Sequence, residues 1–165
     1  MAIPVVDADP ALYSYTLDGV IQRAVAENSS GEVTGPARRG GSPLLTGEPG
    51  VIYANSLGVT EPALPAGKPA PASPRAVPQA KVEVYINGVR QRLRSVTLVP
   101  GEIGVFRISF DIAPETPVHP QDDNRVWIRI GTRESARLVI ELSRSDAATG
   151  NGLDVIGLRE QVDER

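Results

Sequence analysis

Hydrophobic and polar residues alternate most regularly in the second half of the chain. Four segments place Val, Ile, Leu or Phe at every second position, with mostly polar residues between them: 81–87, 105–112, 125–130 and 137–142. Successive side chains of a β-strand point to opposite faces, so this period of two predicts strands with one buried side and one solvent-facing side. Four such strands predict antiparallel sheets that pack face to face.

Turn-forming pairs separate these segments. Asn87–Gly88 lies between 82–86 and 89–98, and Gly131–Thr132 follows the segment 125–130. Because Asn and Gly both tolerate a positive φ, the first pair predicts a two-residue hairpin. The second pair predicts another hairpin, which leads into the last alternating segment.

The first half of the chain carries a weaker pattern. Segments 13–17 and 20–27 are expected to pair around Asp18–Gly19, and 51–54 is expected to be a short buried strand. Six prolines fall within 62–78, which is typical of an extended connector or crossover. The sequence predicts no helix longer than a turn or two.

Composition agrees with an all-β fold. Sixteen Gly and fifteen Pro disfavour helices, and an aromatic content of 4% leaves the core to Val, Ile and Leu, which suit pleated sheets. We divide the chain into an N-terminal arm or lead-in strand (1–19), a folded domain (20–143) and a polar C-terminal tail (144–165). Both terminal segments exceed what a sandwich needs.

Charge and motifs restrict the function. A net charge of −3 argues against nucleic-acid binding, and no apolar run approaches the length of a membrane span. The chain lacks cysteine and lacks the short motifs of nucleophilic, metal-dependent or nucleotide-dependent catalysis. We therefore expect no enzyme activity, no cofactor and no metal site. The N-terminus does not resemble a signal peptide, which fits either a cytoplasmic protein or a mature or excised piece.

Two stretches resemble a known family. They are GVIYANSLGVTEPALPAGKPAPASP (50–74) and KVEVYINGVRQRLRSVTLVPGEIGVFRISFDI (81–112). Their order and spacing are similar to the uncharacterised C-terminal domain found in secreted proteins of Solibacter and other acidobacteria. Asn87 departs from the usual first Gly of the turn, and the segment around Arg90 is more basic than in that family. The resemblance implies an Ig-like antiparallel β-sandwich with a Pro-rich crossover, an extracellular or cell-surface setting and no catalytic residues.

Trp127 is the strongest candidate contact residue. It lies between Arg125 and Arg129 on the side of its strand that alternation assigns to solvent. An exposed Trp beside Arg could stack on a sugar ring or anchor a protein partner. The alternative is that the Pro-rich crossover or the C-terminal tail covers Trp127.

Arg90, Arg92 and Arg94 form a second candidate. On one strand they would share a face, as a basic stripe for an acidic polysaccharide or an acidic partner surface. The alternative is a solvated face whose charges discourage edge-to-edge aggregation.

Two functional hypotheses follow, with a third as a reserve. The first is a structural or assembly module that joins copies or neighbouring domains through strand edges or terminal arms. The second is an adhesion module that binds a glycan or a protein with an exposed Trp and Arg sheet face. The third is an excised domain of a larger secreted protein with only a spacer role.

Overall fold

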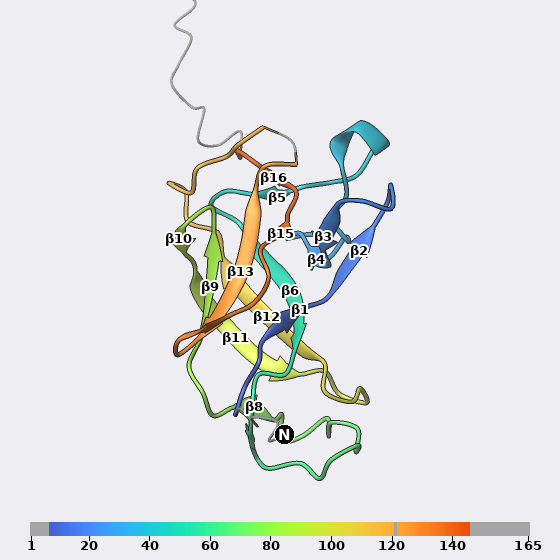
Figure 1. The fold of residues 1–165 in the computed structure, drawn as a ribbon, viewed down its shortest axis with the longest axis vertical. Helices are drawn as coiled ribbons and strands as arrows, with labels where there is room; N and C mark the ends of the chain where they lie inside the picture. The colour runs from blue at the N-terminus through green and yellow to red at the C-terminus, as the bar shows by residue number, and fades with distance from the viewer. Residues whose placement is uncertain (1–6, 121, 146–165) are drawn as a thin grey trace, which may run out of the picture.

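A computed structural model describes residues 7–120 and 122–145, and these residues fold mostly as β-structure (Figure 1). The strands are β1 (Ala11–Leu12), β2 (Ser14–Thr16), β3 (Gln22–Ala24), β4 (Ala26–Glu27), β5 (Leu44–Leu45), β6 (Pro49–Asn55), β7 (Thr60–Glu61), β8 (Val77–Pro78), β9 (Val82–Ile86), β10 (Val89–Arg90), β11 (Arg92–Leu98), β12 (Phe106–Asp111), β13 (Arg125–Ile130), β14 (Arg133–Glu134), β15 (Leu138–Val139) and β16 (Leu142–Ser143). The described residues contain no α-helix, only the 3-10 turn η1 (Ala37–Arg39). The prediction of a β-rich fold is confirmed.

Two large sheets organise these strands. A five-stranded sheet has the order β1-β6-β12-β11, with β4 also paired to β6. A seven-stranded sheet has the order β10-β9-β13-β15-β3-β2, with β14 also paired to β13. Most neighbours are antiparallel, as predicted, whereas β15 with β3 and β16 with β5 are parallel. The pairs β16–β5 and β7–β8 form two small sheets toward opposite ends of the molecule in Figure 1.

One hydrophobic core receives side chains from both large sheets. Alternate positions of β9, β12 and β13 supply its central side chains, as the period of two predicts: Val82, Val84, Ile86, Phe106, Ile108, Phe110, Val126, Ile128 and Ile130. Strand β6 adds Ile52 and Ala54, both fully buried. Each buried aliphatic or aromatic side chain stabilises the fold by roughly 1.5–3 kcal/mol, so these strands anchor the molecule.

The three predicted turns are confirmed. Asn87 and Gly88 have φ values of 49° and 86°, the conformation that a two-residue hairpin between β9 and β10 requires. Gly131–Thr132 joins β13 to β14, and Asp18–Gly19 lies between the paired strands β2 and β3. Backbone chemistry at the turns therefore fixes the local pairing that the sequence suggests.

Asn87 also connects its turn to the rest of the fold. Its side-chain amide donates to the carbonyl oxygen of Pro117 (2.7 Å) and to Oδ1 of Asn124 (2.8 Å). Its Oδ1 accepts from the backbone N–H of Arg125 (2.7 Å). A glycine could adopt the same φ but could make none of these side-chain hydrogen bonds.

The expected strand over 89–98 is divided at Gln91. Strand β10 pairs with β9 in the seven-stranded sheet, whereas β11 pairs with β12 in the five-stranded sheet. Gln91 is 3% exposed; its N–H donates to the Val84 carbonyl (2.8 Å), and its side chain bonds the Val89 carbonyl (2.7 Å) and the Ala113 N–H (2.8 Å). These hydrogen bonds hold the chain where it crosses between sheets. A single strand over 89–98 is therefore a wrong prediction.

The last alternating segment is also divided between sheets. Strand β15 pairs with β13 and β3, and β16 pairs with β5. Residues 138–142 are all buried, so the prediction of a solvent-facing side holding Val139 and Glu141 is wrong. Glu141 is buried in an ion pair with Arg23 of β3.

The Pro-rich segment 62–78 forms a loop closed by β7 and β8, at the lower end of the molecule in Figure 1. Its Ala76 is buried and accepts a hydrogen bond from the N–H of Leu98 (2.9 Å), at the end of β11. Ala70 is also buried and pairs with Pro100. The segment thus covers one end of the edge strand β11.

The two predicted terminal segments differ in what the structure describes. Within 1–19, residues 11–16 contribute β1 to the five-stranded sheet and β2 to the seven-stranded sheet. This part of the predicted arm is a lead-in to both sheets. Of the predicted tail 144–165, residues 146–165 lie outside the described residues.

Candidate binding surface

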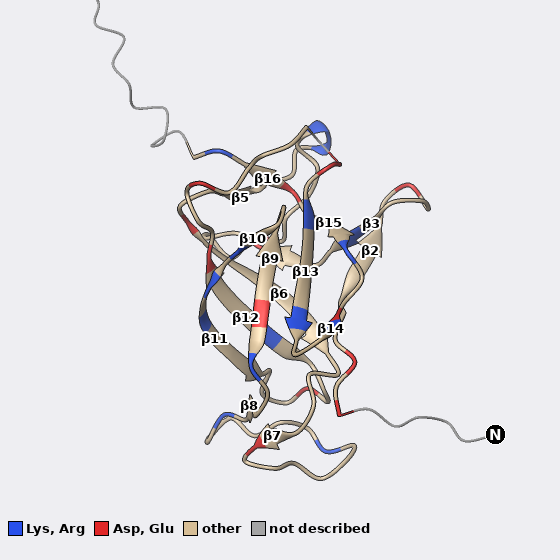
Figure 2. Cartoon of the chain, turned by 60° about the vertical axis from the view of Figure 1, so that its left-hand side comes forward, with Lys and Arg blue, Asp and Glu red and all other residues tan. Residues whose placement is uncertain are grey.

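The outer face of β9 and β13 brings several candidate residues together. In the antiparallel register Tyr85 lies opposite Trp127, and Glu83 lies opposite Arg129. Directly opposed side chains of an antiparallel pair are close enough to interact. In Figure 2 the acidic part of β9 accordingly lies beside a basic part of β13.

Trp127 is buried on this face. It is 7% exposed and stacks on Tyr85, with ring centroids 5.4 Å apart and planes 9° from parallel. The Arg137 guanidinium lies 4.3 Å from the centroid of its ring system. Of the two interpretations, the exposed Trp is wrong and the covered Trp is confirmed: alternation correctly indicated the outer face, and among the described residues Tyr85 and Arg137 lie against the indole. Its Nε1 has no hydrogen-bond partner among the described residues.

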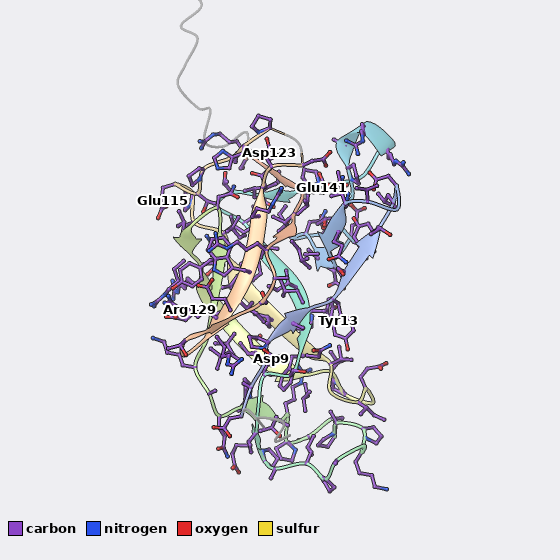
Figure 3. The ribbon with its side chains drawn as sticks, viewed as in Figure 1. Asp9, Tyr13, Glu115, Asp123, Arg129 and Glu141 are labelled. Atoms are coloured by element: carbon purple, nitrogen blue, oxygen red, sulfur yellow. The ribbon has the colours of Figure 1, made fainter. Side chains whose placement is uncertain are left out.

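Glu83 is the centre of an ionic cluster. Its Oε2 accepts two hydrogen bonds from Arg129 (2.9 and 2.7 Å), and its Oε1 lies 3.0 Å from Arg90 and 3.5 Å from Lys81. Arg129, labelled in Figure 3, also donates to the Tyr85 hydroxyl (2.5 Å). The hydrogen bonds from Arg129 hold the pKa of Glu83 below its ordinary value, and the same contact raises the pKa of Arg129. Sequence reasoning missed Glu83 because the register of β9 against β13 is a tertiary property.

Arg90, Arg92 and Arg94 do not form one stripe. Arg90 belongs to the seven-stranded sheet, and Arg92 and Arg94 belong to the five-stranded sheet, because the chain changes sheets at Gln91. The prediction of one strand face is therefore wrong. A groove of about 420 Å³ lies where β10 and β11 part, and residues 81–83 and 90–93 line it. Both Arg90 and Arg92 line this groove.

Arg94 and Asp111 form an ion pair beside the groove. Arg94 Nε lies 2.5 Å from Asp111 Oδ1. Arg92 is opposite Asp111 in the register of β11 and β12, yet it makes no ion pair within the described part of the chain. Arg92 is exposed and therefore carries a charge available to a ligand.

Arg125 lies apart from the Glu83 cluster. Its Nη1 donates to the backbone carbonyls of Asp122 (2.5 Å) and Asn124 (3.2 Å). Asn124 is 2% exposed, and its side chain bonds the backbone N–H and carbonyl of His119 (2.8 and 3.2 Å). Arg125 therefore helps to fix the loop before β13.

A buried ionic cluster lies at another place in the fold. Arg23 of β3 is 1% exposed and binds both Glu141, labelled in Figure 3, and Asp122 Oδ1 (2.5 Å). Arg38 of η1 binds Asp122 Oδ2 (2.9 Å). Burial raises the pKa of Glu141, although Arg23 opposes this effect, whereas hydrogen bonds from Arg38 and Arg23 lower the pKa of Asp122. No sequence signal connects Arg23 with a carboxylate 118 positions away.

An apolar groove follows β2, the outer strand of the seven-stranded sheet. It has a volume of about 290 Å³ and is lined by Tyr15, Leu17, the segment 33–36, Arg39 and Gly41. Leu17 and Val33 are 39% and 61% exposed. The Tyr15 hydroxyl donates to the carbonyl of Thr34 (2.9 Å), which connects β2 with the loop that forms the opposite wall.

The described residues offer neither a metal-ligand group nor a membrane-spanning helix. In the ranges 7–120 and 122–145, no three His, Cys, Asp or Glu residues are grouped so as to hold a metal ion, and no helix is long and apolar enough to span a membrane. Comparisons with models of known protein families, with curated proteins and with solved structures give no match.

Proposed function

We propose that this chain is a non-enzymatic, Ig-like β-sandwich module of an extracellular or cell-surface protein, and that it joins copies of itself or neighbouring domains through a strand edge. The single core shared by the two large sheets supports the sandwich. The resemblance of 50–74 and 81–112 to a domain of secreted acidobacterial proteins supports the Ig-like type and the setting.

The observation that carries this proposal is the contrast between two sheet edges. Strand β11 ends the five-stranded sheet and presents the exposed Arg92 and Arg94, with a register shift between Leu93 and Ser95. Charges and bulges on an edge strand prevent the addition of another strand. The Pro-rich loop covers the end of the same edge at Leu98.

Strand β2 has none of these protections among its described residues. It ends the seven-stranded sheet at the margin of the molecule in Figures 1 and 2, and Ser14–Thr16 carries no charge. The exposed Leu17 and Val33 lie beside it. An edge strand next to an apolar groove suits an added strand, whose backbone pairs with the edge and whose side chains fill the groove.

The non-enzymatic part of the proposal is supported by the use of the buried polar groups. Arg23 and Glu141 neutralise each other, and Gln91 and Asn124 bond loop backbones. Each of these contacts fixes one segment of chain to another. Burial of these side chains is therefore accounted for by the fold.

The test is the solution mass of the purified chain by light scattering over a range of concentrations. We expect the wild type to be heavier than its monomer mass of 17.5 kDa and the variant Leu17→Lys/Val33→Lys to be monomeric. Val59→Lys is the matched control, because Val59 has the same 61% exposure as Val33 and lies outside the groove at β2. A monomeric wild type at every concentration, or equal dissociation by Val59→Lys, would refute joining of copies at β2.

A further inference from the structure

We infer that the groove where β10 and β11 part binds a carboxylate-bearing polysaccharide, with Arg92 and Lys81 as the primary anion contacts. This site lies on a different edge from β2 and goes beyond the proposed joining of chains.

The groove has a local excess of positive charge. Its lining contains three basic side chains, Lys81, Arg90 and Arg92, and one acidic side chain, Glu83. This excess of two positive charges occurs in a chain with a net charge of −3. A localised field of one sign attracts ligands of the opposite sign even when the whole molecule does not.

Glu83 in the groove and Asp111, which lies opposite Arg92, are both already ion-paired. Oε2 of Glu83 accepts from Arg129, and Oε1 contacts Arg90 and, at the longer distance of 3.5 Å, Lys81. Asp111 is engaged by Arg94. Arg92 makes no ion pair within the described ranges, and the Lys81 side chain is 75% exposed. The charges left for a ligand are therefore those of Arg92 and Lys81, which both line the groove.

The groove is also held rigidly. Gln91, between Arg90 and Arg92, is 3% exposed and bonds backbone groups of β9, β10 and the chain after β12. The backbone positions of the two arginines that flank it are thus fixed on different sheets. A site formed before the ligand arrives loses less conformational entropy on binding.

Size and lining favour a sugar acid. A volume of about 420 Å³ lies within the range of sites that hold small organic ligands, roughly 300–1,000 Å³. Leu93, which is partly exposed, contributes apolar surface, which suits the C–H face of a sugar ring. Arginine binds a planar carboxylate through two parallel hydrogen bonds, which a neutral sugar cannot accept in the same way.

The experiment is calorimetric titration of the full chain with a galacturonic acid oligosaccharide, at about 20 mM and about 0.5 M NaCl. A neutral galactose oligosaccharide of the same length is the control ligand. We expect binding of the acidic sugar only, weakened at high salt, and weakened about tenfold by Arg92→Gln because one charge-assisted contact is lost. Arg75→Gln is the control variant, since it removes an equal charge from the exposed Pro-rich loop.

Several results would overturn this inference. Absence of binding, equal binding of the neutral sugar, or equal weakening by Arg75→Gln would each exclude a carboxylate site at Arg92. Tighter binding of a single-stranded DNA of equal charge would show that the ligand class is wrong. The variant Leu17→Lys/Val33→Lys should bind the acidic sugar as the wild type does, so failure here and failure of the proposed assembly are distinguishable.

Discussion

Arg23 is a buried cation, and we expect its substitution to destabilise the fold. It is 1% exposed and neutralises Glu141, whose carboxylate is also buried. The substitution Arg23→Met keeps most of the side-chain volume but leaves that carboxylate without its cation. We expect the free energy of unfolding at pH 7, measured by urea denaturation, to fall by about 3–5 kcal/mol.

Two further variants test the cause of that loss. The double variant Arg23→Met/Glu141→Leu removes both charges, and we expect it to recover a large part of the stability. Arg38→Met removes the cation of the cluster whose side chain is 44% exposed and should cost less than about 1 kcal/mol. A double variant as unstable as Arg23→Met would show that the loss comes from packing.

Trp127 shows at the residue scale what alternation can and cannot predict. Its place on the outer face of β13 was predictable from alternation, and the register with β9 confirms that face. Its cover was not predictable, because Tyr85 and Arg137 reach it from other strands or turns. Periodicity assigns a side chain to a face but contains no information on what lies over that face.

At the scale of the elements, variants in the turn between β9 and β10 distinguish two contributions to stability, that of backbone conformation and that of side-chain hydrogen bonds. Glycine also tolerates the φ of 49° at this position, but the substitution Asn87→Gly removes the side-chain hydrogen bonds to Pro117, Asn124 and Arg125. We expect the free energy of unfolding to fall by about 1–3 kcal/mol, because buried partners lose their bonds. Thermal and urea denaturation followed by circular dichroism measure this change.

The neighbouring Gly88 supplies the complementary variant. Gly88→Ala keeps every Asn87 hydrogen bond but places a Cβ at φ of 86°, which should cost about 1 kcal/mol or more. An Asn87→Gly variant as stable as the wild type would mean that the three bonds contribute nothing net. In that case Asn87 would serve the turn only through its tolerance of positive φ.

Most of the central strands could be predicted from sequence, whereas their membership of sheets could not. Strands β9, β12 and β13 and their inward faces follow from alternation and turn chemistry. The crossing at Gln91 does not follow from the pattern, because one polar residue at an inward position does not reveal that the chain changes sheets there. Residues 138–142 show the same limit, since alternation cannot reveal that both sides of a segment are buried.

At the scale of the whole molecule, the ionic clusters depend on contacts between distant segments. Glu83 meets Arg129 across 46 positions, and Arg23 meets Asp122 across 99. The sequence offered Arg90, Arg92 and Arg94 as one stripe because they are close along the chain. The fold instead uses Arg90 with Glu83 and Arg94 with Asp111. Candidate sites of this kind become visible only with the topology.

These clusters also determine how stability depends on pH. The pKa values of Glu83 and Asp122 are lowered by hydrogen bonds from arginines, so their contribution is present above the unfolded-state values and lost as pH falls through the folded ones. The pKa of Glu141 is raised by burial, so its contribution is full below its unfolded value and lost as pH rises through the folded one. Asp18, whose pKa is lowered by backbone N–H groups, adds to the first class.

Because the lowered carboxyls outnumber the raised one, we expect the urea midpoint to fall as pH decreases from about 5 to about 2. Glu83→Gln should show a shallower fall, since one proton-linked group has been removed, while Glu102→Gln, an exposed carboxyl outside the described ion pairs, should follow the wild type. A Glu83→Gln curve parallel to that of the wild type would mean that Arg129 and Arg90 stabilise this carboxylate equally in the unfolded chain. A midpoint that rises in acid would instead make the buried Glu141 the dominant titrating group of the molecule.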